Sequence, residues 1–171
     1  MKRQIKNSNR GMTLIETLVT IGLIIVIFSF TVFTNIDSFR SSSFAKERDT
    51  LISALEHARS EAISNICRGP SCTDGKPHGV AVRPADHLGS YVIFQTETGM
   101  AYGDRTAEDK SQDILLDSDT NMIVEVGSLT EVIFSQLSSN VSTPGNITVR
   151  DTNNHTSTIT INGEGQILWT N

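Results

Sequence analysis

A long charge-free stretch near the amino terminus constrains this chain more than any other feature of its sequence. Residues 17–36 are 20 positions without a charge, rich in Leu, Ile, Val and Phe. As an α-helix rising about 1.5 Å per residue, this stretch is long enough to cross the ~30 Å hydrocarbon layer of a membrane. Residues 1–10 contain four basic and no acidic side chains, which favours a cytoplasmic amino terminus. We therefore expect a single-pass protein of the inner (cytoplasmic) membrane with a periplasmic or extracellular carboxy-terminal domain.

A single carboxylate lies where this apolar helix should begin. Glu16 is one helical turn inside the predicted helix, where a charge is costly unless it is paired or neutralised. A secretory signal peptide fits poorly, because the apolar run is too long and no small-residue cleavage site follows it. A plain membrane anchor gives no reason for Glu16. Cleavage after Gly11 would remove every leader charge and create an amine at Met12, with which Glu16 of a neighbouring subunit could pair.

The stretch GMTLIE, residues 11–16, resembles the processing signature of type IV pilins and type II secretion pseudopilins. In those families a basic leader and a glycine precede an apolar stretch with glutamate fifth after the cut. The resemblance implies that a prepilin peptidase cleaves between Gly11 and Met12 and methylates the new amine of Met12. It also implies an assembly salt bridge from Glu16 to Met12 of an adjacent subunit. The implied partners are other pilins or pseudopilins and an inner-membrane assembly platform, and the implied product is a cell-surface filament.

Apolar residues continue at helical spacing beyond the charge-free stretch. They form one stripe at intervals of three and four residues, namely Leu51, Leu55, Ala58, Ala62 and Ile66. Charged residues, Glu47 and Glu61 among them, fill much of the remaining surface. The first proline of the chain, Pro70, follows Gly69 and stops the pattern. We expect one helix over about 13–67: a transmembrane and filament-core part at 12–36 and an amphipathic part at 37–68.

The rest of the chain, residues 69–171, changes from helical spacing to a period of two. Strand candidates separated by turn residues occur at 79–83, 91–95, 122–126, 131–134, 146–150, 158–161 and 166–169. The last three have short links and predict an antiparallel meander. Residues 103–121 are polar and acidic, and we interpret them as a mobile loop with a brief strand at 114–116.

These segments predict an α+β fold, with a long amino-terminal transmembrane and amphipathic helix packed on a carboxy-terminal antiparallel β-sheet domain. Residues 1–11 would be a cleaved leader. The order of one long helix followed only by strands is similar to the minor pseudopilin group called GspH or FimT. Residues 55–63 and 159–167 are similar to that group's helical entry into the globular domain and to its closing hairpin. The resemblance implies a pilin-like fold.

Two cysteines, Cys67 and Cys72, lie close together just after the predicted helix. A structural zinc site needs four ligands, and the four histidines do not complete one at a recognisable spacing. If the domain is exported, a disulfide between the cysteines is favoured, and two free thiols are the alternative. Asp117, Asp119 and Asn121 alternate like the start of a calcium loop but lack its glycine and closing glutamate. We expect no metal and no cofactor.

No catalytic constellation is evident in the sequence. His57, Arg59 and Glu61 lie near one another in the predicted helix, but alternate helical positions point to different sides, so we interpret them as a solvated face. Nucleic acid is not expected as a partner, because Arg150 is the one Arg or Lys after Lys110 and phosphate attraction needs clustered positive charge.

The sequence therefore predicts a structural subunit and not an enzyme. It would be a minor pilin or pseudopilin of a type IV pilus or a type II secretion pseudopilus, processed by prepilin peptidase and assembled through its amino-terminal helix. One alternative is a minor pilin for DNA uptake (competence), which would need a basic surface patch. Another is a membrane-tethered β-domain that binds a ligand of its own, which would leave Glu16 unexplained.

Overall fold

The structure is a computed structural model that describes residues 13–69, 74–118, 122–125, 127–152 and 154–170, except for the side chains of residues 31–40. The chain divides into two compact units, Met1–Ser41 and Ser42–Asn171. The first unit contains the start of one long helix. The second contains the rest of that helix and every strand of the described chain.

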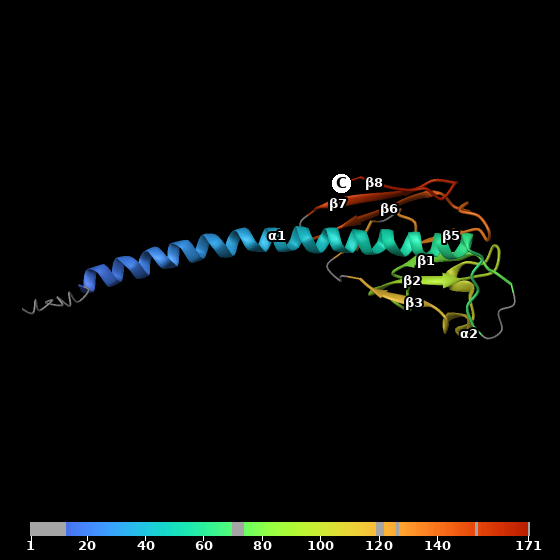
Figure 1. Ribbon diagram of the computed structural model, residues 1–171, viewed down its shortest axis with the longest axis horizontal. Helices are drawn as coiled ribbons and strands as arrows, with labels where there is room; N and C mark the ends of the chain where they lie inside the picture. The colour runs from blue at the N-terminus through green and yellow to red at the C-terminus, as the bar shows by residue number, and fades with distance from the viewer. Residues whose placement is uncertain (1–12, 70–73, 119–121, 126, 153, 171) are drawn as a thin grey trace, which may run out of the picture. The chain divides into compact units, whose positions relative to one another are not determined.

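The long helix, α1, comprises Leu14–Ile63, a length of 50 residues (Figure 1). Its continuity follows from the sequence, because the chain has no proline before Pro70 and α1 contains a single glycine, Gly22. The helix begins within one residue of its predicted start.

The predicted transmembrane helix over residues 12–36 is contradicted. Within the described part of the chain, no helix is both long and apolar enough to cross a membrane. Met12 lies outside the described residues. The expected inner-membrane, single-pass location depended on this helix and is contradicted with it.

α1 ends four residues before the predicted Cys67. Asn65 adopts a left-handed conformation with φ 55°. Its N–H donates to the carbonyl of Ala62 at 3.3 Å, and the N–H of Ile66 donates to the carbonyl of Glu61 at 3.0 Å. This pair of hydrogen bonds is the Schellman arrangement, which satisfies carbonyl groups that a helix end would leave free. The asparagine therefore stops the helix before Gly69 is reached.

Eight strands follow the helix and form two antiparallel sheets of four strands each. The first sheet has the order β3-β2-β1-β5 and the second the order β4-β6-β7-β8. The bounds are β1 His78–Val82, β2 Ser90–Gln95, β3 Ile114–Asp117, β4 Ile123–Val124, β5 Glu131–Phe134, β6 Gly145–Arg150, β7 Thr156–Ile161 and β8 Ile167–Thr170. Every predicted strand position is occupied, and the predicted closing meander is confirmed as β6-β7-β8.

One apolar core joins the second unit's part of α1 to both sheets. The helix contributes its stripe, including Leu51, Leu55, Ala58 and Ala62, all of them at most 1% exposed. The sheets contribute alternate strand residues, namely Val80, Tyr91 and Ile93 from the first sheet and Ile147, Val149, Ile159 and Ile161 from the second. In Figure 1 this part of α1 lies between β6–β8 on one side and β1–β3 on the other. In β5 and β7 buried residues alternate with less buried ones, as expected for strands with one face toward the core, whereas β1 and β2 are buried on both faces.

The expected fold class is therefore corrected. Besides the missing transmembrane helix, the β-residues of the antiparallel domain are divided between two sheets, a division that the sequence analysis did not predict. The strand pattern in the sequence indicates the face of each strand but not its partners, so it does not give the number of sheets. The predicted loop at 103–121 also contains a 3₁₀ turn, η1 Tyr102–Asp104, and a short helix, α2 Ala107–Lys110, before β3.

Candidate functional site

Glu16 lies in the first turn of α1, where the sequence predicted it. Its backbone N–H donates to the carbonyl of Thr13 at 3.0 Å, and the Thr13 hydroxyl lies 3.4 Å from the same N–H. The side chain of Glu16 is exposed and has no hydrogen-bond or ion-pair partner among the described residues. A carboxylate in the first turn interacts favourably with the positive end of the helix dipole. Glu16 is therefore compatible with the helix and remains available to a partner.

The apolar side chains before and after Glu16 are exposed on every side of the helix. Leu14 is 80% exposed and Phe30 75%, and even Ile24 is 52% exposed. A helix that is apolar all round normally lies buried in a protein interior or among other helices. Residues 13–30, hereafter the assembly segment, therefore present an apolar surface that the described chain does not cover.

The hydroxyl groups of the assembly segment do not interrupt this apolar surface. Thr17 donates to the carbonyl of Leu14 at 2.8 Å, and Thr20 donates to the carbonyl of Thr17 at 2.9 Å. Ser29 donates to the carbonyl of Ile25 at 2.8 Å. Because these donors are satisfied within the helix, burying them against another helix would not leave them unpaired.

The other predicted processing and disulfide residues are only partly described. Gly11 and Met12 lie outside the described residues, so cleavage and methylation there stay predictions. Cys67 is disulfide-bonded. Cys72 also lies outside the described residues, and the pairing of Cys67 with Cys72 stays a prediction.

A buried ionic cluster forms around Glu61, which the sequence had placed on a solvated face. Glu61 is 7% exposed and forms an ion pair with the guanidinium of Arg68. Its carboxylate also lies 3.5 Å from Nε2 of His57 and 3.8 Å from Nε2 of His78. The predicted divergence of His57 and Glu61 is therefore wrong, because residues four apart lie on the same side of a helix.

This cluster joins the end of α1 to the first sheet. The backbone N–H of Arg68 donates to Oε1 of Gln95 at 2.8 Å, and Nε2 of Gln95 donates to the carbonyl of Arg68 at 2.6 Å. Nδ1 of His78 lies 2.9 Å from the carbonyl of Lys76. Burial lowers the pKa of His78 below its ordinary value of 6.5, although the nearby Glu61 carboxylate opposes that shift. The arrangement suits a structural role, because its charged groups contact one another and do not line a cleft.

A second ionic contact between α1 and the first sheet lies at the other end of β1. Glu47, 6% exposed, is 3.9 Å from the guanidinium of Arg83, which directly follows β1. Arg83 also donates to the hydroxyl of Ser118 at 2.8 Å and to the carbonyl of Met122. Glu47 and Glu61 on α1 therefore contact opposite ends of the same strand. No feature of the sequence identifies Glu47 as buried, because its position also fits the charged side of an amphipathic helix.

Arg105 and Asp113 form a buried ion pair that sequence reasoning missed. Two guanidinium nitrogens of Arg105 donate to the two carboxylate oxygens of Asp113 at 2.9 and 2.7 Å. The Arg105 guanidinium also lies 5.1 Å from the ring centroid of Phe94 and 5.5 Å from that of Tyr102. This ion pair holds the segment from η1 to β3 in place. It could not be recognised in the sequence, because the residues around it are mostly polar and indicate an exposed loop.

Two further sites were considered in the sequence and not predicted, a calcium loop and a nucleic-acid contact. Of the alternating set Asp117, Asp119 and Asn121, only Asp117 lies within the described residues. Among the described residues, no group of three potential ligands could hold a metal ion. Arg150, considered for nucleic-acid contact, lies 3.6 Å from the carboxylate of Glu125. A phosphate would therefore have to compete with a carboxylate already beside this arginine.

Comparisons of this chain with known protein families, with curated proteins and with solved structures found no match. Within the described chain, the assembly segment with Glu16 combines an unsatisfied charge with an uncovered apolar surface.

Proposed function

We propose that this chain is a minor pilin or pseudopilin, a structural subunit of a type IV pilus or a type II secretion pseudopilus. A prepilin peptidase removes residues 1–11 and methylates the amine of Met12. The processed chain then joins the filament through the assembly segment, in contact with other pilins or pseudopilins and with the assembly platform.

The observation that carries this proposal is Glu16, the one charged side chain among residues 13–30. The surrounding surface gains from burial, since each large apolar side chain contributes about 1.5–3 kcal/mol when it leaves water. Burial of an unpaired Glu16 carboxylate would oppose that gain. Pairing with the amine of Met12 on a neighbouring subunit removes the conflict, because both charges are then buried together.

The proposal is tested at its first chemical step by the mass of the mature protein. The full chain is produced in cells with an active prepilin peptidase and in matched cells whose peptidase is inactive. With the active enzyme, intact-mass analysis should show Met12 as the first residue, carrying one methyl group. With the inactive enzyme the leader should remain. Retention of Met1 in the presence of the active peptidase would contradict the proposal.

A further inference from the structure

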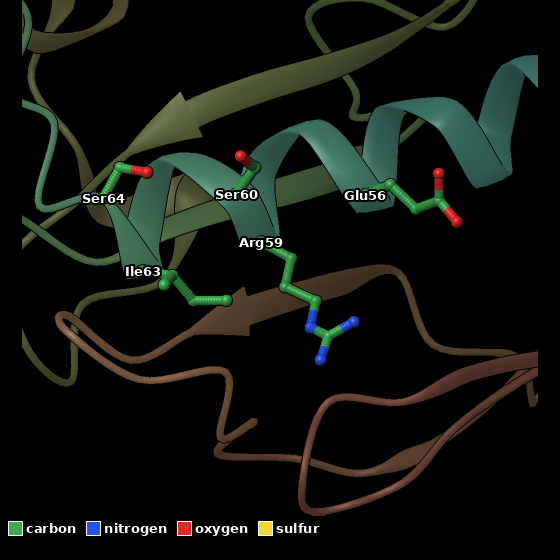
Figure 2. Close-up of a pocket in the computed structure, with 5 residues that line it drawn as sticks. All are labelled: Glu56, Arg59, Ser60, Ile63 and Ser64. Carbon is green, nitrogen blue, oxygen red and sulfur yellow. The ribbon is translucent and has the colours of Figure 1, made fainter.

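Arg59 points into a hollow on the exposed side of α1, in the second unit of the chain. The hollow has a volume of about 350 Å³ and is lined by Glu56, Arg59, Ser60, Ile63 and Ser64. Figure 2 shows Arg59 and Ile63 extending from the same side of the helix. The guanidinium and one apolar side chain therefore share a wall of the hollow.

The guanidinium of Arg59 is without a protein partner in the described chain. Its Nε–H is buried and donates no hydrogen bond to a described residue, and Arg59 forms no ion pair with any described carboxylate. The side chain as a whole is half-buried. By contrast, the guanidiniums of Arg68 and Arg105 each form an ion pair with a carboxylate. A half-buried guanidinium with unused donors is a good receptor for an anion, because its planar fork matches two oxygen atoms.

The surroundings of Arg59 select a single carboxylate over a polyanion. Glu56 lines the same hollow, so the one positive charge of Arg59 lies beside one negative charge, and the hollow lacks the clustered positive charge that a chain of phosphates needs. Ile63 is 46% exposed at the hollow and favours an apolar neighbour for the incoming anion. An Asp or Glu side chain on a protein surface meets both conditions, whereas nucleic acid meets neither.

We infer that Arg59 receives an acidic side chain of a neighbouring subunit in the filament, with Ile63 in contact with an apolar residue beside it. This inference rests on the proposed function, which supplies the neighbour. The contact belongs to the globular unit and is separate from the Met12–Glu16 pair of the assembly segment. It would fix which subunit lies beside this one.

The test places a photo-crosslinking amino acid at Ser60, which lines the hollow, in the full chain in filament-producing cells. Illumination should join Ser60 to another pilin-type subunit in the sheared filament fraction, through a peptide that contains Asp or Glu. Arg59→Met should lower the yield about tenfold, as expected for loss of a charged hydrogen bond. Glu56→Gln is the matched control and should leave the yield unchanged or raise it. Arg59→Lys, which keeps the charge but loses the fork, should give an intermediate yield.

The controls separate a lost contact from a lost fold. Arg59→Met should keep or raise the melting temperature, because it removes a buried nitrogen that has no partner. The charges can also be exchanged, with Arg59→Glu in this chain and with the acidic residue of the crosslinked partner changed to Arg. This combination should restore the yield of crosslinked product. Three results would overturn the inference: a crosslinking yield that Arg59→Met does not change, no crosslinked product, or a product with nucleic acid. If the chain is still incorporated normally into filaments, the proposed function stands in each of these cases. Absence of the unaltered chain from filaments would overturn both.

Discussion

Arg105 brings a positive charge into an apolar part of the globular unit, and its neighbours make this possible. Its side chain is 1% exposed and that of Asp113 is 5% exposed. Two parallel hydrogen bonds join the pair, and the rings of Phe94 and Tyr102 flank the guanidinium. A charge buried this deeply is tolerated only while its partner remains.

Arg105→Met should therefore destabilise the protein by about 3–5 kcal/mol, because Asp113 would be left as an unpaired buried charge. Urea unfolding followed by circular dichroism measures the change. Lys76→Met is the control, since Lys76 lies 3.6 Å from Glu97, a carboxylate that is 69% exposed. Its loss should cost less than about 1 kcal/mol. Equal effects of the two substitutions would show that burial of the Arg105 pair has no special role.

His78 makes the stability of the globular unit depend on pH. Its ring is fully buried beside Glu61, Arg68 and His57, and burial lowers its pKa below 6.5. Above pH 6.5 the folded and unfolded chains both hold a neutral His78. Below it the unfolded chain binds more protons, so stability should fall as the pH is lowered through 6.5 toward the folded pKa. Urea unfolding from about pH 7.5 to about pH 5.5 should show this loss.

The matched variant for this effect is His78→Asn, whose amide can still reach the carbonyl of Lys76. It should be less stable overall, but its stability should depend less on pH in the same range. A slope as steep as that of the unaltered protein would assign the pH dependence to another group.

At the scale of elements, the turn between β7 and β8 is held against the segment that follows β5. Gly165 in this turn has φ 71°, and a Cβ there would lie 1.9 Å from the carbonyl oxygen of Ser139. The hydroxyl of Ser139 donates to the carbonyl of Glu164 at 2.8 Å, and the N–H of Val141 donates to the carbonyl of Gly163 at 3.1 Å. The close approach of two backbones therefore requires glycine at position 165.

Gly165→Ala should destabilise the protein by at least about 2 kcal/mol, through left-handed strain and displacement of the Ser139 backbone. Gly163 lies in the same turn, and a Cβ there would meet nothing within 4 Å. Gly163→Ala should accordingly be nearly neutral in the same thermal unfolding experiment. If both substitutions lowered the stability equally little, the close approach of Gly165 to the Ser139 backbone would be contradicted.

The strands could be predicted from the sequence, but their assembly into sheets could not. Alternation of buried and exposed residues, as in β7, follows directly from one-sided packing and is visible in the sequence. The pairing of β5 with β1, across more than 40 residues of chain, left no such trace. Likewise, the stripe of α1 was predictable, whereas the end of α1 depended on the backbone conformation of Asn65.

Buried charges were the features of the globular unit that sequence reasoning assigned wrongly. Glu47 and Glu61 lie beside the apolar stripe and were taken as solvated, because charged residues are seldom buried without a partner. Their partners, Arg83 and Arg68, come from outside the helix. Only the folded arrangement brings these charges together.

At the scale of the whole molecule, the chain combines a globular unit with its own core and a first unit whose described side chains are mainly exposed. The core of the globular unit contains residues from both sheets and from α1. In the assembly segment, most large apolar side chains are more than half exposed. The place of Glu16 was predictable because a lone charge in an apolar run is visible in the sequence. The exposure around it required the structure.

The measurement that tests the filament account most directly compares the sheared filament fraction with total protein for the unaltered chain and for Glu16→Leu. Thr17→Val is the control, because it changes a polar residue of the same turn without removing a charge. Glu16→Leu should be cleaved and should accumulate normally, but its incorporation into filaments should fall at least about tenfold, since the amine of Met12 would be buried without its partner. Thr17→Val should be incorporated normally. Undiminished incorporation of Glu16→Leu would contradict the account.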